Sequence, residues 1–304
     1  MSNPTSAKGS LVRENNGSTA LTINPERAYA SRRIIILKEL FYLYCVTKDK
    51  PSAYNFEDLG IKTHPIYFQG TYAIISKVSP DDFSENNLKK NLADMGWVEK
   101  NTRLHEKVIE EIMRDQAVLP FKFGTVFEKE TNVEKLLKTN NLEFKTVLAG
   151  LDGKEEWGLK IYCDNEYFKD ALCRENERIR EKDKEITSAG KGKAYFLKKK
   201  KDAIIKDIIN EKISEYTKDC FERLKITAVD TKINKILPKE VTERKDEMVF
   251  NVAFLVNTKR IGEFNNVLGY LKTKYSDKGI NFDCTGPWPP YNFCGLLKEK
   301  IRNG

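Results

Sequence analysis

The stretch Glu156-Trp157-Gly158-Leu159-Lys160-Ile161-Tyr162-Cys163 (residues 156–163) decides how the second half of this 304-residue chain folds. Its aromatic and β-branched residues cover the length of one strand. Helical periodicity follows over residues 165–223, with a break at 188–192, which predicts a helical hairpin. The remaining predicted elements are strands at 226–236 and 248–256, a helix over 264–275 and a strand at 280–284. The order β-α-β-β-α-β is typical of a ferredoxin-like domain, here modified by the extended hairpin.

The first half predicts a second, smaller α/β domain. Strands are expected at 33–47, 66–68, 72–75 and 118–121, and helices at about 92–116 and 130–149. Gly150 and Gly153 interrupt the chain, so we place the boundary there and predict domains over 33–152 and 153–304. Residues 1–32 are rich in Ser, Asn, Gly and Ala, and are expected to form a disordered tail. The fold class of the chain is therefore mixed α/β, of the α+β kind, with two domains.

Composition excludes a membrane protein and favours a globular one. The 53 basic and 45 acidic residues give a net charge of +8, and the mean hydropathy is −0.56. Sixteen Phe, thirteen Tyr and three Trp are enough for hydrophobic cores. The longest apolar stretch, 34–46, is interrupted by Lys38 and Glu39 and is too short to span a bilayer. Residues 1–32 lack the apolar segment of a signal peptide, so a cytoplasmic protein without membrane contact is expected.

Cysteine and histidine usage predicts no metal site. The chain has six cysteines and none forms a Cys-x-x-Cys pair. Its two histidines, His64 and His105, are too few for a histidine-rich site. Several cysteines stand beside aromatic residues, which is typical of buried, reduced thiols in a cytosolic protein. We expect neither metal nor cofactor.

Catalytic motifs are absent from the sequence. It contains no G-x-S-x-G, no G-x-x-x-x-G-K-[ST] and no G-x-G-x-x-G. Two interpretations of His105 stay open: a general base, or a structural histidine that bonds a backbone carbonyl at a helix interface. The second is the more common, so we expect no enzyme. A deep polar pocket around His105 would favour the first.

Between Arg174 and Lys212 the chain carries 13 basic and 8 acidic residues, including the run Lys198–Lys201. Acids interleaved at helical spacing favour a solvated helix face with i,i+4 ion pairs. An acidic protein partner and a nucleic acid are the other readings. The strands lack the aromatic pattern of RNA-recognition domains, so we expect no nucleic-acid partner. A nucleic-acid-binding module remains the alternative function, and a gel shift at physiological salt would distinguish it.

Five unusual sequence motifs stand out along the chain. They are the helix with His105-Glu106, VLPFKFGTVF at 118–127, EWGLKIYCD at 156–164, GKAYFL at 192–197 and TGPWPPYNF at 285–293. In this order they resemble the GvpF/GvpL family of gas vesicle proteins, over about residues 40–293. The chain departs from that pattern at Lys122, where Arg is usual, and Lys cannot reproduce the bidentate arginine fork. It also departs at Asn101, where a basic residue is common, and we expect that to be a surface change.

The resemblance implies a protein without enzymatic activity. Members of this family are accessory proteins of gas vesicle formation, either minor components or assembly factors. They associate with the small hydrophobic shell protein and with other accessory proteins. The resemblance implies a fold of two α/β domains, one of them a modified ferredoxin fold, and a place in the cytoplasm and at the gas vesicle.

A shell subunit that lines a gas space exposes apolar surface before assembly, so a helper needs an apolar, aromatic surface ringed by charge. We predict this surface near the domain junction, from Phe121, Phe123, Phe127, Trp157, Trp288, Pro289, Pro290 and Tyr291. The alternative is that Trp157 and alternate residues of 121–127 are core, and that Trp288 fills the gap between domains. A second, electrostatic contact with other accessory proteins is predicted at Lys199 and Lys200 of the hairpin.

Overall fold

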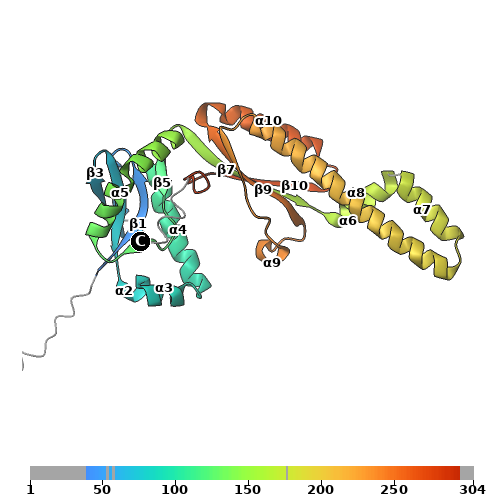
Figure 1. The fold of residues 1–304 in the computed structure, drawn as a ribbon, viewed down its shortest axis with the longest axis horizontal. Coiled ribbons are helices and arrows are strands. Elements are labelled where there is room, and N and C mark those ends of the chain that lie inside the picture. The colour runs from blue at the N-terminus through green and yellow to red at the C-terminus, as the bar shows by residue number, and fades with distance from the viewer. Residues whose placement is uncertain (1–38, 53–54, 57–58, 176, 295–304) are drawn as a thin grey trace, which may run out of the picture. The chain divides into compact units, whose positions relative to one another are not determined.

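The computed structural model describes residues 39–52, 55–56, 59–175 and 177–294 (Figure 1). The tail predicted at 1–32 and the start of the strand predicted at 33–47 lie outside these residues. The described chain contains two antiparallel sheets with helices packed on them, and the mixed α/β class is confirmed.

The first sheet has the order β2-β3-β4-β1-β5, and β6 also pairs with β1. Its strands are β1 (Leu40–Thr47), β2 (Asn55–Phe56), β3 (Ile61–Phe68), β4 (Thr71–Val78), β5 (Val118–Pro120) and β6 (Val126–Phe127). Strands β3 and β4 form a hairpin, and β5, which ends in Pro120, lies at an edge of the sheet. Strand β2 and the first part of β3 lie in residues 48–65, between two predicted strands, and were not predicted. His64 is therefore a strand residue, and its Nε2 lies 3.6 Å from Glu130 Oε1.

Four helices accompany this sheet, namely α2 (Pro80–Phe83), α3 (Glu85–Asn91), α4 (Met95–Met113) and α5 (Glu130–Leu151). The side chain of Asp94 begins α4, since its Oδ1 accepts from the backbone N–H groups of Gly96 and Trp97. Helix α4 packs with Tyr42 and Tyr44 of β1, whereas α5 packs with Leu43. Successive residues of a strand point to opposite faces, so the two helices cover opposite faces of the sheet. Burial on both faces explains why β1 is almost continuously apolar.

The second sheet has the order β10-β7-β9-β8, with every pair antiparallel. Its strands are β7 (Lys154–Cys163), β8 (Asp230–Ile233), β9 (Glu247–Asn257) and β10 (Ile280–Trp288). Its helices are α6 (Asn165–Glu175), α7 (Glu177–Ser188), α8 (Lys191–Lys225), α9 (Lys239–Thr242) and α10 (Ile261–Lys274). The predicted β-α-β-β-α-β order is present. Strand β10 runs four residues beyond its predicted end and includes Trp288.

Helices α8 and α10 pack on one face of the second sheet. Leu224 of α8 and Phe264 of α10 are fully buried in a core with Leu159 and Phe254. The helical interruption predicted at 188–192 is also present: Gly190 stands at the N-terminal cap of α8 and separates it from α7 (Figure 1). Residues 191–193 therefore follow a helix and not a strand.

Cys45, Cys163 and Cys220 are free and buried, as expected, and Cys294 is also buried. Burial raises the pKa of the Cys163 and Cys220 thiols to about 12, so these thiols stay protonated at neutral pH. Within the described residues, no three His, Cys, Asp or Glu side chains group as metal ligands. Over the same residues, no helix has the length and apolarity that crossing a membrane requires.

Candidate functional site

His105 of α4 is almost fully buried and makes three polar contacts. Its Nδ1 lies 2.9 Å from the Tyr42 hydroxyl, and its Nε2 lies 3.1 Å from the Phe121 carbonyl oxygen and 3.0 Å from the Tyr291 hydroxyl. A carbonyl oxygen can only accept, so Nε2 carries the proton and Nδ1 accepts from Tyr42. The structural interpretation of His105, as a histidine bonded to a backbone carbonyl, is confirmed.

These contacts extend into a chain of hydrogen bonds. The backbone N–H of Gly124 donates to the Tyr42 hydroxyl oxygen at 3.0 Å. At the other end, the Tyr291 hydroxyl donates to Glu106 Oε1 at 3.0 Å. The network therefore runs Gly124–Tyr42–His105–Tyr291–Glu106. It connects the His-Glu helix, the FGT turn and the PPY segment, which are three of the strings that stand out in the sequence.

Burial favours the uncharged forms of the groups in this network. It lowers the pKa of His105 to about 4, so the ring is neutral at physiological pH. It also raises the pKa values of Tyr42 and Tyr291, so both hydroxyls remain protonated. The pKa of Glu106 is raised for the same reason, and its Oε2 is buried without a hydrogen-bond partner in the described part of the chain.

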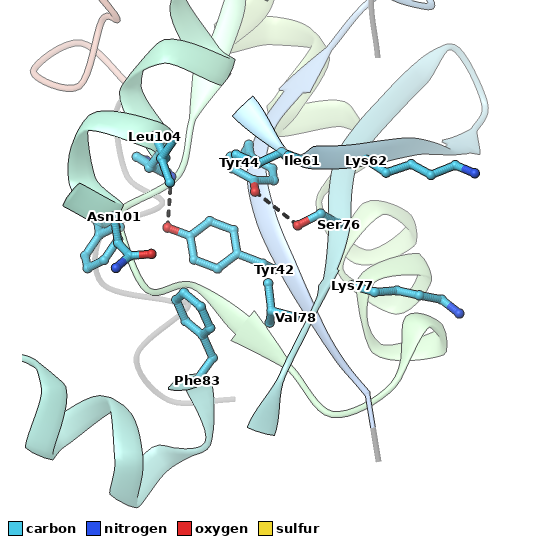
Figure 2. Close-up of a pocket in the computed structure, with 13 residues that line it drawn as sticks. Tyr42, Tyr44, Ile61, Lys62, Ser76, Lys77, Val78, Phe83, Asn101 and Leu104 are labelled. Carbon is cyan, nitrogen blue, oxygen red and sulfur yellow. Dashed lines mark hydrogen bonds between the residues drawn. The ribbon is translucent and has the colours of Figure 1, made fainter. Parts of the chain in front are cut away.

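Beside the network lies a cavity of about 190 Å³, lined by Tyr42, Tyr44, Phe83, Phe123 and His105 among others. Figure 2 shows Tyr42 and Tyr44 side by side, with Lys62 and Lys77 extending away from them. The Tyr44 hydroxyl lies 3.0 Å from Ser76 Oγ, and the Tyr42 hydroxyl is engaged with His105 (Figure 2). A pocket near His105 is thus present, but its polar groups bond one another. Asn101 also lines it and is partly exposed.

An aromatic cluster closes one side of this cavity. Ring centroids lie 5.4 Å apart for Tyr42 and Phe83, 5.4 Å for Phe83 and Trp97, 6.0 Å for Trp97 and Phe123, and 6.3 Å for Phe123 and Tyr42. Tyr42 is buried, whereas the other three rings are partly exposed. Such edge-on contacts fix the rings relative to one another.

Two further apolar side chains stand shortly before Trp97 in the sequence and are exposed. Met95 in the first turn of α4 is 76% exposed, and Leu92 just before it is 49% exposed. We call Phe83, Leu92, Met95, Trp97 and Phe123 the aromatic patch. Of these five, only Phe123 was predicted as a docking residue. For Phe83, Leu92 and Met95, the sequence signal that could have identified them was the isolation of each apolar residue within the polar segment 79–96.

Three predicted docking residues lie in the interior. Phe121 packs its ring 6.2 Å from that of Phe144 in the first core. Pro289 and Pro290 are also buried. These three side chains are therefore not part of an exposed surface, which corrects their assignment. The sequence motifs that contain these residues are apolar because these side chains pack in the protein interior.

The other predicted aromatic residues differ in exposure. Phe127 is partly buried against the first core, and Trp157 is partly buried with its ring 6.2 Å from Phe264. Tyr291 belongs to the histidine network. Trp288 is 42% exposed and donates from Nε1 to Thr285 Oγ1, so it is not the predicted filler of a gap.

The side chain of Glu156 holds the motif at residues 285–293 in place through hydrogen bonds. Its carboxylate is buried and accepts from Asn292 twice, from the backbone N–H at 2.9 Å and from Nδ2 at 2.6 Å. Gly286 makes this approach possible: its φ is +145°, and a Cβ there would lie 2.9 Å from the Glu156 carbonyl oxygen. The EWG and GPWPPY strings are therefore structural partners.

Lys199 and Lys200 are exposed on α8, as the sequence predicts. The Lys199 ammonium lies 5.1 Å from the centre of the Tyr195 ring, and Tyr195 and Phe196 are themselves exposed. The ion pairs Lys182–Glu185 and Lys212–Glu215 show that acids along the hairpin pair with nearby lysines. A solvated helix face and an exposed aromatic pair thus coexist there.

The arrangement of two antiparallel sheets with their helices defines a known fold. The crystal structure of gas vesicle protein GvpF from Anabaena sp. PCC7120 superposes with a TM-score of 0.65 at 18% identity, covering 85% of this chain and 99% of that one. GvpF from Microcystis aeruginosa superposes with a TM-score of 0.58, also at 18% identity, covering 85% and 100%. At this identity the likeness establishes the fold.

Sequence comparison gives the family. The family described as gas vesicle synthesis protein GvpL/GvpF matches residues 40–295, and this chain belongs to it. Gas vesicle protein L of Streptomyces sp. (strain CB03234) is 24% identical over 266 residues, covering 86% of this chain and 96% of that protein. Gas vesicle protein L1 of Halobacterium salinarum is 25% identical over 285 residues, covering 90% and 93%. Family membership supports a gas vesicle-associated role.

Proposed function

We propose that this chain is a non-enzymatic accessory protein of gas vesicle formation that binds the small hydrophobic shell protein during assembly. The observation that carries the proposal is an exposed aromatic patch on a member of the GvpL/GvpF family. The protein acts in the cytoplasm and at the growing vesicle, as an assembly factor or a minor component.

The chemistry of the patch suits a reversible apolar partner. A shell subunit with an uncovered apolar face aggregates unless another surface covers it. Around the patch, Glu85 pairs with Lys89 and Glu99 pairs with Arg103, and all four side chains are exposed. An apolar centre with a charged rim favours specific association over irreversible adhesion.

The histidine network supports this surface from beneath. The Phe123 ring lies 5.9 Å from the ring of His105, which is held on both nitrogens. Asp94 caps the helix that carries Met95 and Trp97. A surface fixed in this way loses little conformational entropy on binding, which increases affinity.

The hairpin supplies the second contact, with other gas vesicle accessory proteins. Lys199 and Lys200 provide positive charge, and Tyr195 and Phe196 provide exposed apolar area. Rim charges of this kind accelerate association and make it dependent on salt.

At the level of domains, we propose that residues 33–152 form one α/β domain and residues 153–304 a modified ferredoxin-like domain. The strand order β10-β7-β9-β8 supports this, because it corresponds to the order 4-1-3-2 of a split βαβ unit. The hairpin α7–α8 is then the modification of the first crossover.

The test measures how much shell protein stays soluble in the presence of the full-length chain. Met95→Lys and Phe123→Ala are expected to reduce the soluble fraction and the amount captured in a pull-down. Leu142→Lys is the matched control, since Leu142 is equally apolar and 81% exposed on α5 but lies outside the patch. Normal capture by folded patch variants would reject the site, and lack of capture by the unmodified chain would reject the function.

A further inference from the structure

Strand β8 forms an edge of the second sheet and carries exposed apolar side chains. Within the described residues it pairs only with β9. Val229, directly before the strand, is 55% exposed, and Ile233 at its end is 59% exposed. An open edge with exposed β-branched residues is a template for pairing with another strand.

The sequence around this edge is symmetric about Thr231. Asp230 and Lys232 stand one position on either side of it, and Val229 and Ile233 stand two positions away. A strand that pairs antiparallel with its own copy around a central residue places exactly such positions opposite each other.

We propose that β8 pairs antiparallel with β8 of a second copy of this chain, with the two-fold axis at Thr231. Val229 of each copy then faces Ile233 of the other, and Asp230 faces Lys232. The second sheet continues without interruption from one copy into the next. Because the contact is isologous, it closes after two copies and leaves no free β8 edge.

The distribution of the β8 side chains over the two faces of the sheet is consistent with this pairing. Thr231 and Ile233 lie opposite Phe254 and Val252 of β9, whose side chains belong to the core beneath the helices. Asp230 and Lys232 point to the other face, since neighbouring residues of a strand alternate. The apolar pairs thus gather on one face and both ion pairs on the other.

The charges select this partner over a nonspecific one. A lone lysine on an edge strand deters pairing, because it remains unpaired beside a foreign strand. Here each Lys232 meets an Asp230 only when the second strand is the same sequence in the opposite direction. In the single chain Asp230 Oδ1 accepts from the Thr231 N–H at 2.7 Å. Pairing replaces this bond with one from the Thr231 N–H to the second copy, which releases the carboxylate for Lys232.

Charge reversal in the full-length chain tests the register. Asp230→Lys and Lys232→Asp each place like charges opposite each other twice, and we expect the dimer dissociation constant to rise roughly tenfold. The double variant D230K/K232D restores both pairs and should dimerise like the unmodified protein. An equimolar mixture of the two single variants should form a heterodimer, because each opposing pair is again of opposite sign. Sedimentation equilibrium measures all four.

A cysteine at the axis tests the geometry. Thr231→Cys places two thiols directly opposite, within the Cα separation that a disulfide needs, so mild oxidation should give a covalent dimer. Glu240→Cys, exposed but outside the pairing positions, is the control and should remain monomeric on a denaturing gel. The four native cysteines that are buried do not compete.

Three results would overturn the proposal. The unmodified chain could remain monomeric at the highest concentration reached. It could dimerise with the same affinity in both single charge variants, which would place the contact on another surface. Finally, the chain could stay monomeric while Val229→Lys, but not the neighbouring exposed Val241→Lys, loses binding to the shell protein, which would assign the edge to a foreign strand.

Discussion

His105 Nε2 lies 3.0 Å from the hydroxyl oxygen of Tyr291, although 186 positions separate the two residues in the chain. The contact brings the terminal PPY segment against the helix that supports the aromatic patch. It also completes the hydrogen bonding of a buried histidine and of one oxygen of a partly buried carboxylate. Loss of this contact is expected to change the free energy of unfolding, which can be measured separately from binding.

Tyr291→Phe is expected to lower the free energy of unfolding by about 1–3 kcal/mol. The substitution keeps the ring but removes the hydroxyl that donates to Glu106, leaving a buried acceptor without its partner. Urea denaturation measures the change. Tyr195→Phe is the control, since its ring is exposed, and it should shift the midpoint little. Equal effects from both variants would contradict the role of the network.

His105 predicts a pH dependence of stability. Burial lowers its pKa from 6.5 to about 4 in the folded chain. The unfolded chain therefore binds the proton first as pH falls, and up to about 3 kcal/mol of stability is lost between pH 6.5 and pH 4. Glu106 acts in the opposite direction, because its raised pKa favours the protonated folded state.

The difference between the unmodified protein and His105→Asn isolates the histidine contribution. Denaturation at a series of pH values should show a difference that is constant above pH 7 and shrinks toward pH 4. A difference that does not change with pH would mean that folding leaves the pKa of His105 unchanged.

Gly286→Ala is expected to destabilise the chain by about 1–3 kcal/mol or more. Its backbone has φ +145°, and the added Cβ would collide with the Glu156 carbonyl oxygen. Gly269→Ala provides the contrast. Gly269 lies within α10 and a Cβ there meets nothing within 4 Å, so the substitution should stabilise by about 0.5–1 kcal/mol. Thermal unfolding of the two variants should therefore shift in opposite directions.

The hairpin contact predicts a salt-sensitive association. Lys199→Glu combined with Lys200→Glu should slow association with other accessory proteins and flatten its dependence on ionic strength. Surface plasmon resonance at about 50 mM and about 300 mM salt measures both the association rate and its salt dependence. Lys206→Glu changes the charge of the same helix away from the aromatic pair and should retain most of the salt dependence. An unchanged salt slope in the double variant would argue against this contact.

The regular elements could be predicted because their patterns are local. The Trp157–Cys163 strand, the helices around Val108 and Phe264, and the break at Gly190 each follow from spacing within a few residues. The bond from His105 to a backbone carbonyl could also be anticipated, since it is a common solution for a histidine at a helix interface.

Tertiary burial could not be predicted in the same way. Phe121 and Pro290 have the composition of an exposed docking string, yet both are buried by segments distant in the chain. Conversely, Met95 is a single apolar residue in polar sequence, and only the structure shows that it is exposed, in the first turn of the helix that carries Trp97. The start of β3 at Ile61 was missed because its residues are half exposed and its pattern is weak.

The anchoring of Asn292 by Glu156 has a consequence for how the molecule is made. The Tyr42 side of the first sheet receives Tyr291 only after translation has passed residue 291. Until then, a nascent chain on the ribosome holds a histidine and a glutamate that lack one of their final partners. The buried polar network of the first sheet is therefore completed only after Tyr291 has emerged.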